Sequence, residues 1–227
     1  MQKKFIPAAV LFVILLVLIA HFGARLTTVP TFTHADEEKR VYLTFDDGPS
    51  TVITNAVLDV LEEEGVKATF FVVGARVEGR EETLQRIVDE GHTIGVHSNT
   101  HEYKKIYASE KAFLEDIDAC AAIIKKITGI TPRVYRFPGG GLNHEMKYTP
   151  LVEERGYQVV RWNAVCGDAE IPNAAKTTLI QRAAETSKGK CPVVLLLHDS
   201  AKNFSTAEAL PEIIAHFRAE GYAFSSY

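Results

Sequence analysis

The sequence has 227 residues, of which 46% are hydrophobic and 24% are charged, and this is the ordinary composition of a globular protein. That length suffices for one domain with a core of its own, without disulfides or structural metal ions. The formal net charge of −4 argues against a nucleic-acid partner.

The N-terminus has the pattern of an export or membrane segment. Lys3 and Lys4 precede an almost wholly apolar run over residues 5–20, which is typical of a signal peptide or a membrane anchor. A cleavage site after Ala35 lies far beyond that run, so both interpretations stay open. We assign residues 1–24 to the signal or anchor, 25–39 to a linker and 40–227 to the globular body, which we expect to be a monomer outside the membrane, on the cell surface or secreted.

Apolar strand-like runs alternate with helical periodicity along the body. Strands are predicted over residues 41–45, 68–73, 93–96, 134–137, 159–163, 193–197 and 222–225. Helices are predicted over 51–64, with Ser50 as its N-cap and Gly65 as its end, and over 81–90, 109–128, 149–155, 177–186 and 207–220. This alternation predicts an α/β protein with a parallel sheet covered by helices, and the number of units favours a closed or nearly closed barrel.

The most informative motif is Asp46-Asp47, two adjacent carboxylates at the end of the first strand. Neighbouring like charges are costly unless their roles differ, as when one binds a metal ion and the other transfers protons. His97 and His101 are spaced four apart, and on one helical turn both rings would face one ion together with Asp47. Zinc fits this ligand set best, and cobalt, nickel and manganese are the other candidates. Asp46 is then the general base.

Further polar residues follow other predicted strands, and the carboxyl ends of barrel strands meet at one mouth. Arg136 is the expected partner of Asp46, and the N–H of Gly139 in the glycine-rich turn is a candidate oxyanion donor. His198 ends the most apolar strand and becomes a general acid beside a carboxylate, for which Asp168 is the candidate. The three cysteines form no CxxC pair, and whether Cys120, Cys166 and Cys191 pair is left open.

Four segments in this order resemble the successive motifs of the NodB-type polysaccharide deacetylases: Thr44-Phe45-Asp46-Asp47-Gly48, His97-Ser98-Asn99-Thr100-His101, Arg136-Phe137-Pro138-Gly139 and Leu196-Leu197-His198. The resemblance covers roughly residues 40–225 and implies a distorted (β/α) barrel with a divalent metal ion. It implies the same roles for six of the residues named above, which are Asp46, Asp47, His97, His101, Arg136 and His198. It adds one role, because the matching leucine, Leu196, would line the pocket for the acetyl methyl group.

The sequence departs from the family pattern at two positions. Gly139 stands where an aromatic residue often follows the proline, and Ala169 follows Asp168 where a tryptophan is common. An aromatic wall of the acetyl pocket is therefore expected to be missing or to come from elsewhere in the chain.

The sequence thus predicts a metal-dependent hydrolase that removes N-acetyl groups from an extracellular polysaccharide and releases acetate. Peptidoglycan or a chitin-like glycan is the expected substrate. The alternatives are a carbohydrate-binding relative without strong catalysis, an O-acetyl esterase of the xylan type, and an amidohydrolase for small cyclic amides, which the export segment disfavours.

Overall fold

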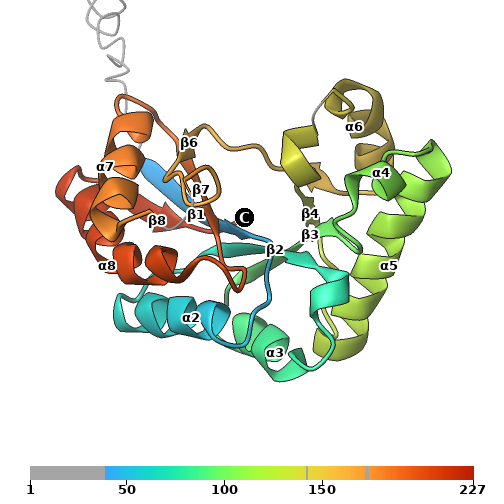
Figure 1. Ribbon diagram of the computed structural model, residues 1–227, viewed down its shortest axis with the longest axis horizontal. Coiled ribbons are helices and arrows are strands. Elements are labelled where there is room, and N and C mark those ends of the chain that lie inside the picture. Colours follow the sequence, from blue (N-terminus) through green and yellow to red (C-terminus); the bar gives the residue numbers. More distant parts are fainter. Residues whose placement is uncertain (1–38, 142, 172–173) are drawn as a thin grey trace, which may run out of the picture. The chain divides into compact units, whose positions relative to one another are not determined.

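The computed structural model describes residues 39–141, 143–171 and 174–227 (Figure 1). The predicted signal or anchor and nearly all of the predicted linker lie outside the described residues. Within those ranges, no helix is long and apolar enough to cross a membrane.

The centre of the body is an eight-stranded sheet in which every pairing is parallel. The strand order is β5-β4-β3-β2-β1-β7-β6, and β8 pairs with the first residues of β1. The strands are β1 Arg40–Asp46, β2 Thr69–Val73, β3 Thr93–Ser98, β4 Val134–Tyr135, β5 Gln158–Val159, β6 Ala164–Val165, β7 Val193–His198 and β8 Ala223–Ser225.

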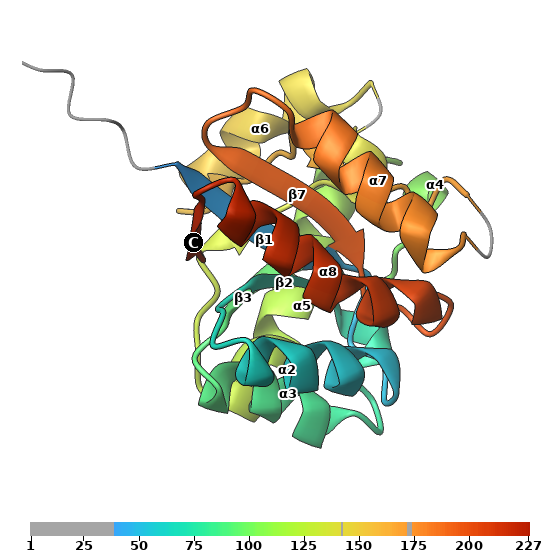
Figure 2. The same ribbon diagram turned by 90° about the vertical axis from the view of Figure 1, so that its left-hand side faces the viewer.

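Helices cover the outer face of this curved sheet (Figures 1 and 2). They are α2 Ile53–Glu63, α3 Glu81–Asp89, α4 Tyr103–Ile106, α5 Glu110–Thr128, α6 Glu145–Glu154, α7 Lys176–Ser187 and α8 Phe204–Ala219, with 3-10 turns at Gly74–Arg76 and Pro138–Gly141. The short helix α4 was not predicted. The hydroxyl of Ser50 accepts hydrogen bonds from the N–H groups of Ile53 and Thr54, although Val52 occupies the cap position.

The predicted strand over residues 159–163 is wrong, because the chain leaves the sheet there. β5 ends at Val159, and the next strand, β6, begins at Ala164 beside β7. The carbonyl of Val160 accepts a hydrogen bond from the Arg136 side chain, and the Asn163 side chain accepts one from the N–H of Val194. These two side chains thus form hydrogen bonds that a neighbouring strand would otherwise make. Among the described residues, β5 and β6 do not pair, so the barrel is open between them. The predicted distorted barrel is confirmed, but it is not closed.

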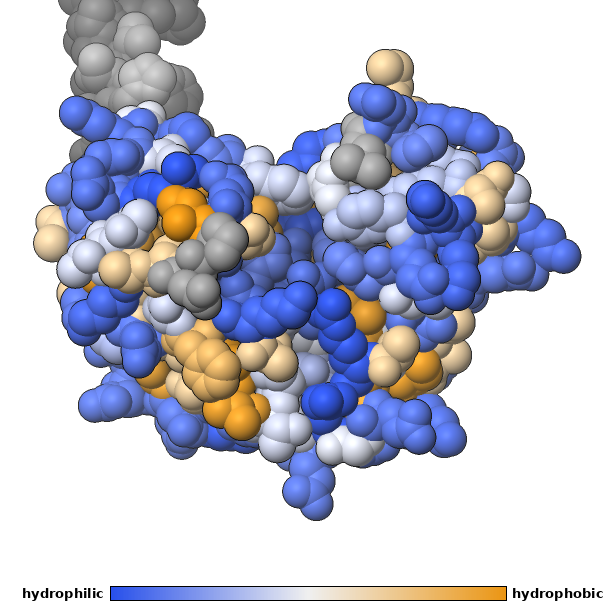
Figure 3. Space-filling model, viewed as in Figure 1, coloured by the Kyte–Doolittle hydropathy of each residue, from blue (hydrophilic) through white to orange (hydrophobic). Residues whose placement is uncertain are grey.

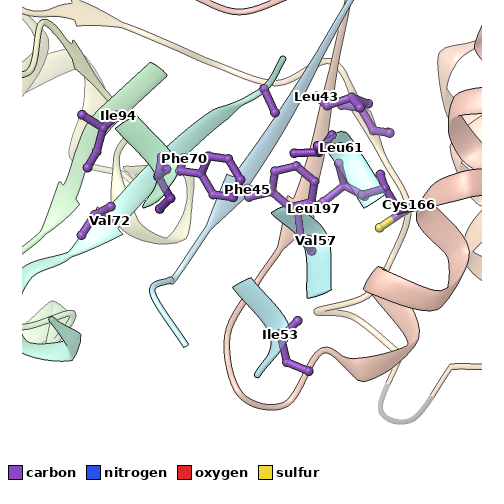
Figure 4. Packing of buried hydrophobic residues seen from close by; sticks show 14 of the residues in the cluster. Leu43, Phe45, Ile53, Val57, Leu61, Phe70, Val72, Ile94, Cys166 and Leu197 are labelled. Carbon is purple, nitrogen blue, oxygen red and sulfur yellow. The ribbon is translucent and has the colours of Figure 1, made fainter. Parts of the chain in front are cut away.

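Alternating side chains of the strands divide the interior into two regions. Outward-facing residues such as Phe45 and Phe70, whose rings stack at 5.1 Å, form the larger core against Ile53, Val57 and Leu61 of α2 (Figure 4). A smaller inner cluster fills part of the barrel, and its buried members are Phe71, Val134, Val160 and Val194. Because Phe45 faces outward, its neighbour Asp46 faces into the barrel at the carboxyl end of β1.

Candidate active site

Three metal-ligating side chains converge at the carboxyl ends of β1 and β3. Oδ1 of Asp47 lies 3.0 Å from Nε2 of His101 and 3.7 Å from Nε2 of His97. One ligand atom from each residue lies within 4.8 Å of the other two. The structure thus brings together all three residues that were predicted from sequence as metal ligands.

The backbone that carries these side chains differs from the predicted helical turn. His97 belongs to strand β3, and His101 lies in the turn that follows, with a φ of +57°. Asp47 also has a left-handed backbone, with a φ of +76°. Such conformations are costly for residues other than glycine and concentrate at functional sites. The prediction of one helical turn was therefore wrong, and a strand end plus a strained turn produce the convergence of the two rings.

The donor set suits a divalent cation. Nδ1 of His97 donates a hydrogen bond to the carbonyl of Arg136 over 2.9 Å, which leaves the Nε2 lone pair directed at the cluster. Burial lowers the pKa of His97, which favours the neutral ring that a metal ion needs. Oδ1 of Asp47 is buried and has no hydrogen-bond partner of good geometry among the described residues. An ion that bound both nitrogens would satisfy this oxygen.

Asp46 is held separately by a buried arginine. Nη1 of Arg136 donates to Oδ1 of Asp46 over 2.9 Å and to the Thr44 hydroxyl over 2.7 Å. The guanidinium of Arg136 lies over the ring of Phe71 at 4.3 Å and is fully buried. Oδ2 of Asp46, the other oxygen, lies 3.9 Å from Nε2 of His97. Arg136 therefore fixes one oxygen of this carboxylate, while the second borders the ligand cluster.

His198 ends β7 opposite Asp46 and pairs with Asp168. Oδ1 of Asp168 lies 2.8 Å from Nδ1 of His198, and Oδ2 accepts the backbone N–H of His198 and the Thr206 hydroxyl. Burial alone lowers the pKa of His198, but the hydrogen bond and charge of Asp168 raise it to about 9. The histidine therefore retains its proton near neutral pH.

The neighbouring carboxyl group of Asp199 points elsewhere. It accepts a hydrogen bond from the Thr54 hydroxyl over 2.6 Å, and burial raises the pKa of Asp199 to about 7. A Cβ at Gly48 would lie 2.2 Å from the Asp199 carboxylate, so the glycine after the aspartate pair is required for space. The sequence-based choice of Asp168 over Asp199 as the partner of His198 agrees with this geometry.

The two remaining predicted site residues border the same region. Leu196 pairs with Thr44 across the sheet, two residues before His198, so its side chain lies on the barrel face that also carries Asp46. Gly139 lies in the turn after β4, where the Tyr107 hydroxyl donates to the carbonyl of Pro138 over 3.0 Å. The position of a Cβ at Gly139 would be 3.2 Å from the Tyr103 ring, which itself packs against the ring of His101.

Comparison of the sequence with known proteins identifies the family to which the chain belongs. The family model for polysaccharide deacetylases matches residues 33–160. The chain belongs to the polysaccharide deacetylase family. A peptidoglycan-N-acetylglucosamine deacetylase of Bacillus cereus is 32% identical over 206 residues, which are 88% of this chain and 73% of that protein. One of Listeria monocytogenes is 32% identical over 86% of this chain, which spans only 40% of the Listeria protein.

Solved structures of the polysaccharide deacetylase family share the fold. The catalytic domain of a peptidoglycan N-acetylglucosamine deacetylase from Eubacterium rectale superposes with a TM-score of 0.76 at 32% identity, over 83% of this chain and 88% of that one. A CE4 esterase from Streptococcus mutans gives a TM-score of 0.78 at 30% identity, over 84% of this chain and 86% of that one. The open parallel barrel is therefore the fold of this family.

Asp116 of α5 is a supporting residue that the sequence analysis missed. Its carboxylate accepts the backbone N–H groups of Asn99 and Thr100 and the Thr100 hydroxyl, at 2.8 to 3.0 Å. These bonds fix the turn that holds His101. A signal was available, because Asp116 lies on the buried face of α5 at helical spacing from Phe113 and Cys120.

We expect Asp116→Ala to lower the affinity for a divalent metal ion by about 10- to 100-fold, because the loss of a residue that orients a metal ligand has effects of this size. Chelator competition measures this. Asp118→Ala is the matched control, since Asp118 lies on the same helix but forms an exposed ion pair with Arg155. Equal metal affinities of the two variants would contradict the role of Asp116.

Aromatic side chains from other segments lie near Gly139 and Ala169, the two positions at which the sequence departs from the family pattern. Ala169 lines a pocket of about 610 Å³ that also contains Asp47, His198 and Phe204. Phe204, the first residue of α8, is 60% exposed. Tyr103 occupies the space beside Gly139. Phe204 and Tyr103 are thus the aromatic side chains that lie near these two positions.

Proposed function

We propose that this chain is a zinc-dependent deacetylase that removes N-acetyl groups from an extracellular polysaccharide, with peptidoglycan as its substrate. One observation carries the proposal. A cluster of one carboxylate and two imidazoles, an arginine-bound carboxylate and a carboxylate-bound histidine meet at one edge of the sheet in a member of this family. These are the groups that amide hydrolysis requires, namely a cation site, a base and an acid.

In this proposal Asp47, His97 and His101 hold the zinc ion, since one carboxylate oxygen and two imidazole nitrogens with open positions form a usual catalytic zinc set. When bound, zinc makes a water molecule acidic enough to act as a nucleophile near neutral pH, and it polarises a carbonyl. All other steps belong to the side chains and backbone of the protein.

Asp46 accepts the proton of the attacking water through Oδ2, while Arg136 holds Oδ1 and keeps the carboxylate oriented. The N–H of Gly139 donates a hydrogen bond to the acetyl oxygen as negative charge develops on it. Leu196 contributes an apolar wall for the acetyl methyl group.

His198 completes the reaction as the general acid. Its Nδ1 is bound to Asp168, so Nε2 is the atom that donates a proton to the departing nitrogen. A carbon–oxygen bond forms and the carbon–nitrogen bond breaks. The products are acetate and a free amino sugar.

The names of related proteins support a cell-wall substrate. They include peptidoglycan-N-acetylglucosamine deacetylases and a peptidoglycan-N-acetylmuramic acid deacetylase of Bacillus subtilis that is 34% identical over 82% of this chain. In this proposal residues 1–24 anchor the protein to the membrane or direct its export, and residues 25–39 link them to the catalytic body over residues 40–227. The body would then act on this polymer at the cell surface as a monomer.

A second candidate is the removal of O-acetyl groups from xylan. A bifunctional xylanase/deacetylase of Pseudobutyrivibrio xylanivorans is 34% identical over 96% of this chain, although the chain spans only 34% of that protein. The same base and acid would serve ester hydrolysis.

Acetate release from purified peptidoglycan, chitin oligomers and acetylated xylan tests the proposal. We expect release from peptidoglycan, loss of at least about 100-fold on chelation, and recovery with added zinc, because the nucleophile depends on the ion. His101→Ala should lose both bound zinc and activity. His144→Ala is the control, since the ring of His144 stacks on Tyr107 outside the ligand cluster.

Activity that survives complete chelation would contradict the metal dependence. Faster release from xylan than from peptidoglycan would favour the esterase. Glycan binding without any acetate release would favour the carbohydrate-binding alternative.

A further inference from the structure

A second groove opens beside the active-site pocket and is lined by three cationic side chains. The groove has a volume of about 240 Å³, and Arg76, Arg80 and Lys202 line it. It shares Asp47, Ser200 and Lys202 with the larger pocket that contains His198. The two hollows are therefore adjacent, and these three residues lie between them. Figure 3 shows a largely hydrophilic hollow on this face of the body.

Two of the three cationic side chains of the groove, Arg80 and Lys202, have no acidic partner among the described residues. Lys202 is exposed and forms no hydrogen bond or ion pair with any of the described residues. Nη1 of Arg80 donates only to carbonyl oxygens, those of Arg76 at 2.9 Å and Glu78 at 3.3 Å. The acidic side chains of Glu78 and of the following helix α3 do not line the groove.

Arg76 has the one carboxylate of the groove as its neighbour. Its Nη1 bonds to the carbonyl of Asp47 and lies 3.5 Å from Oδ1 of Asp47. In the proposed function Oδ1 of Asp47 binds the zinc ion, so the negative charge of Asp47 offsets the charge of zinc. Arg80 and Lys202 then have no anionic partner among the residues that the structure describes, and an anionic group of the substrate would supply one.

We propose that this groove binds a carboxylate carried by the glycan next to the acetylated sugar, so that the enzyme prefers acidic acetylated glycans to neutral ones. The inference rests on the proposed function and specifies its substrate class. Guanidinium and ammonium groups are the usual partners of carboxylates. Arg80 and Lys202 line the same groove and could together bind one carboxylate at the edge of the active-site pocket. Such a carboxylate could belong to a lactyl group on the sugar or to a neighbouring uronic acid.

The test compares one acetylated glycan fragment with its carboxylates free or converted to methyl esters. We expect wild type to have the higher kcat/KM on the free acid. In Arg80→Gln/Lys202→Gln this preference should fall by about three- to tenfold, the effect expected for two partly exposed charge pairs. The preference of wild type should also weaken at high salt. Lys125→Gln/Lys126→Gln is the control, because it removes the same charge at the far end of α5.

Binding measured without turnover separates this inference from the proposed function. In an Asp46→Asn background, calorimetry of both fragments should show tighter binding of the free acid, and the two groove substitutions should abolish that difference. Equal binding and turnover of acid and ester by wild type would overturn the inference while leaving the deacetylase intact. An equal loss in the control pair would also overturn it. Preferential binding of the acid without acetate release from either fragment would support the groove and overturn the proposed function. The lactyl and uronic sources are distinguished by fragments that carry only one of them.

Discussion

Asp46→Asn is expected to lower kcat for acetate release by about 10²- to 10⁴-fold, the usual contribution of a general base. Asparagine retains an oxygen that can accept the hydrogen bond from Nη1 of Arg136, but it cannot take a proton from water. Because Asp46 is not one of the three clustered ligands, the bound metal content should stay near that of wild type. Steady-state kinetics and metal analysis on the same preparation measure both quantities.

Thr44→Val is the matched control for this substitution. Thr44 is the other side-chain acceptor of Nη1 of Arg136, so the valine variant disturbs the same buried arginine while the carboxylate remains. We expect Thr44→Val to lose less than about tenfold in kcat, since one neutral hydrogen bond contributes far less than a catalytic base. Equal losses in the two variants would mean that the positioning of Arg136, and not proton transfer by Asp46, limits the reaction.

The sequence alone was sufficient to predict that the candidate site residues lie together at one edge of the sheet. The strands at 41–45, 93–96 and 193–197 are mainly apolar, and each is followed by a polar residue. In a parallel barrel the carboxyl ends of such strands share one rim, so Asp46, His97 and His198 had to lie near one another. This argument depends only on strand direction and on alternation, and small errors in element boundaries do not affect it.

Features that depend on side chains filling backbone positions could not be predicted in this way. Val159, Val160 and Trp162 form an apolar run typical of a strand. The buried guanidinium of Arg136 donates a hydrogen bond to the carbonyl of Val160. No local sequence pattern predicts a hydrogen bond between residues 24 positions apart. The turn at His101 is similar, because its left-handed backbone is fixed by Asp116 from another element. Long-range polar contacts thus set both the opening of the barrel and the shape of the ligand turn.

The Asp168–His198 pair should set the alkaline limit of activity. His198 must hold a proton to act as an acid, so activity is expected below its pKa and is lost as pH rises through it. Burial lowers this pKa, but Asp168 and, to a smaller extent, the charges of Asp46 and Asp47 raise it to about 9. Asp168→Asn removes the negative charge, while the burial that lowers the pKa of His198 remains. The alkaline limb of kcat/KM should therefore move to lower pH by more than about one unit.

The comparison between variants isolates Asp168 because wild type and variant share every other charged side chain. Thr206→Val is the control, since it removes a hydrogen bond to Oδ2 of Asp168 but keeps the carboxylate charge. Its alkaline limb should stay within about half a unit of wild type, because a neutral hydrogen bond changes the pKa of His198 only through Asp168. An unchanged pH profile in Asp168→Asn would mean that His198 does not donate the proton in the limiting step. The amine would then leave with a proton from another group, and the acid would have to be sought among the other residues of the 610 Å³ pocket.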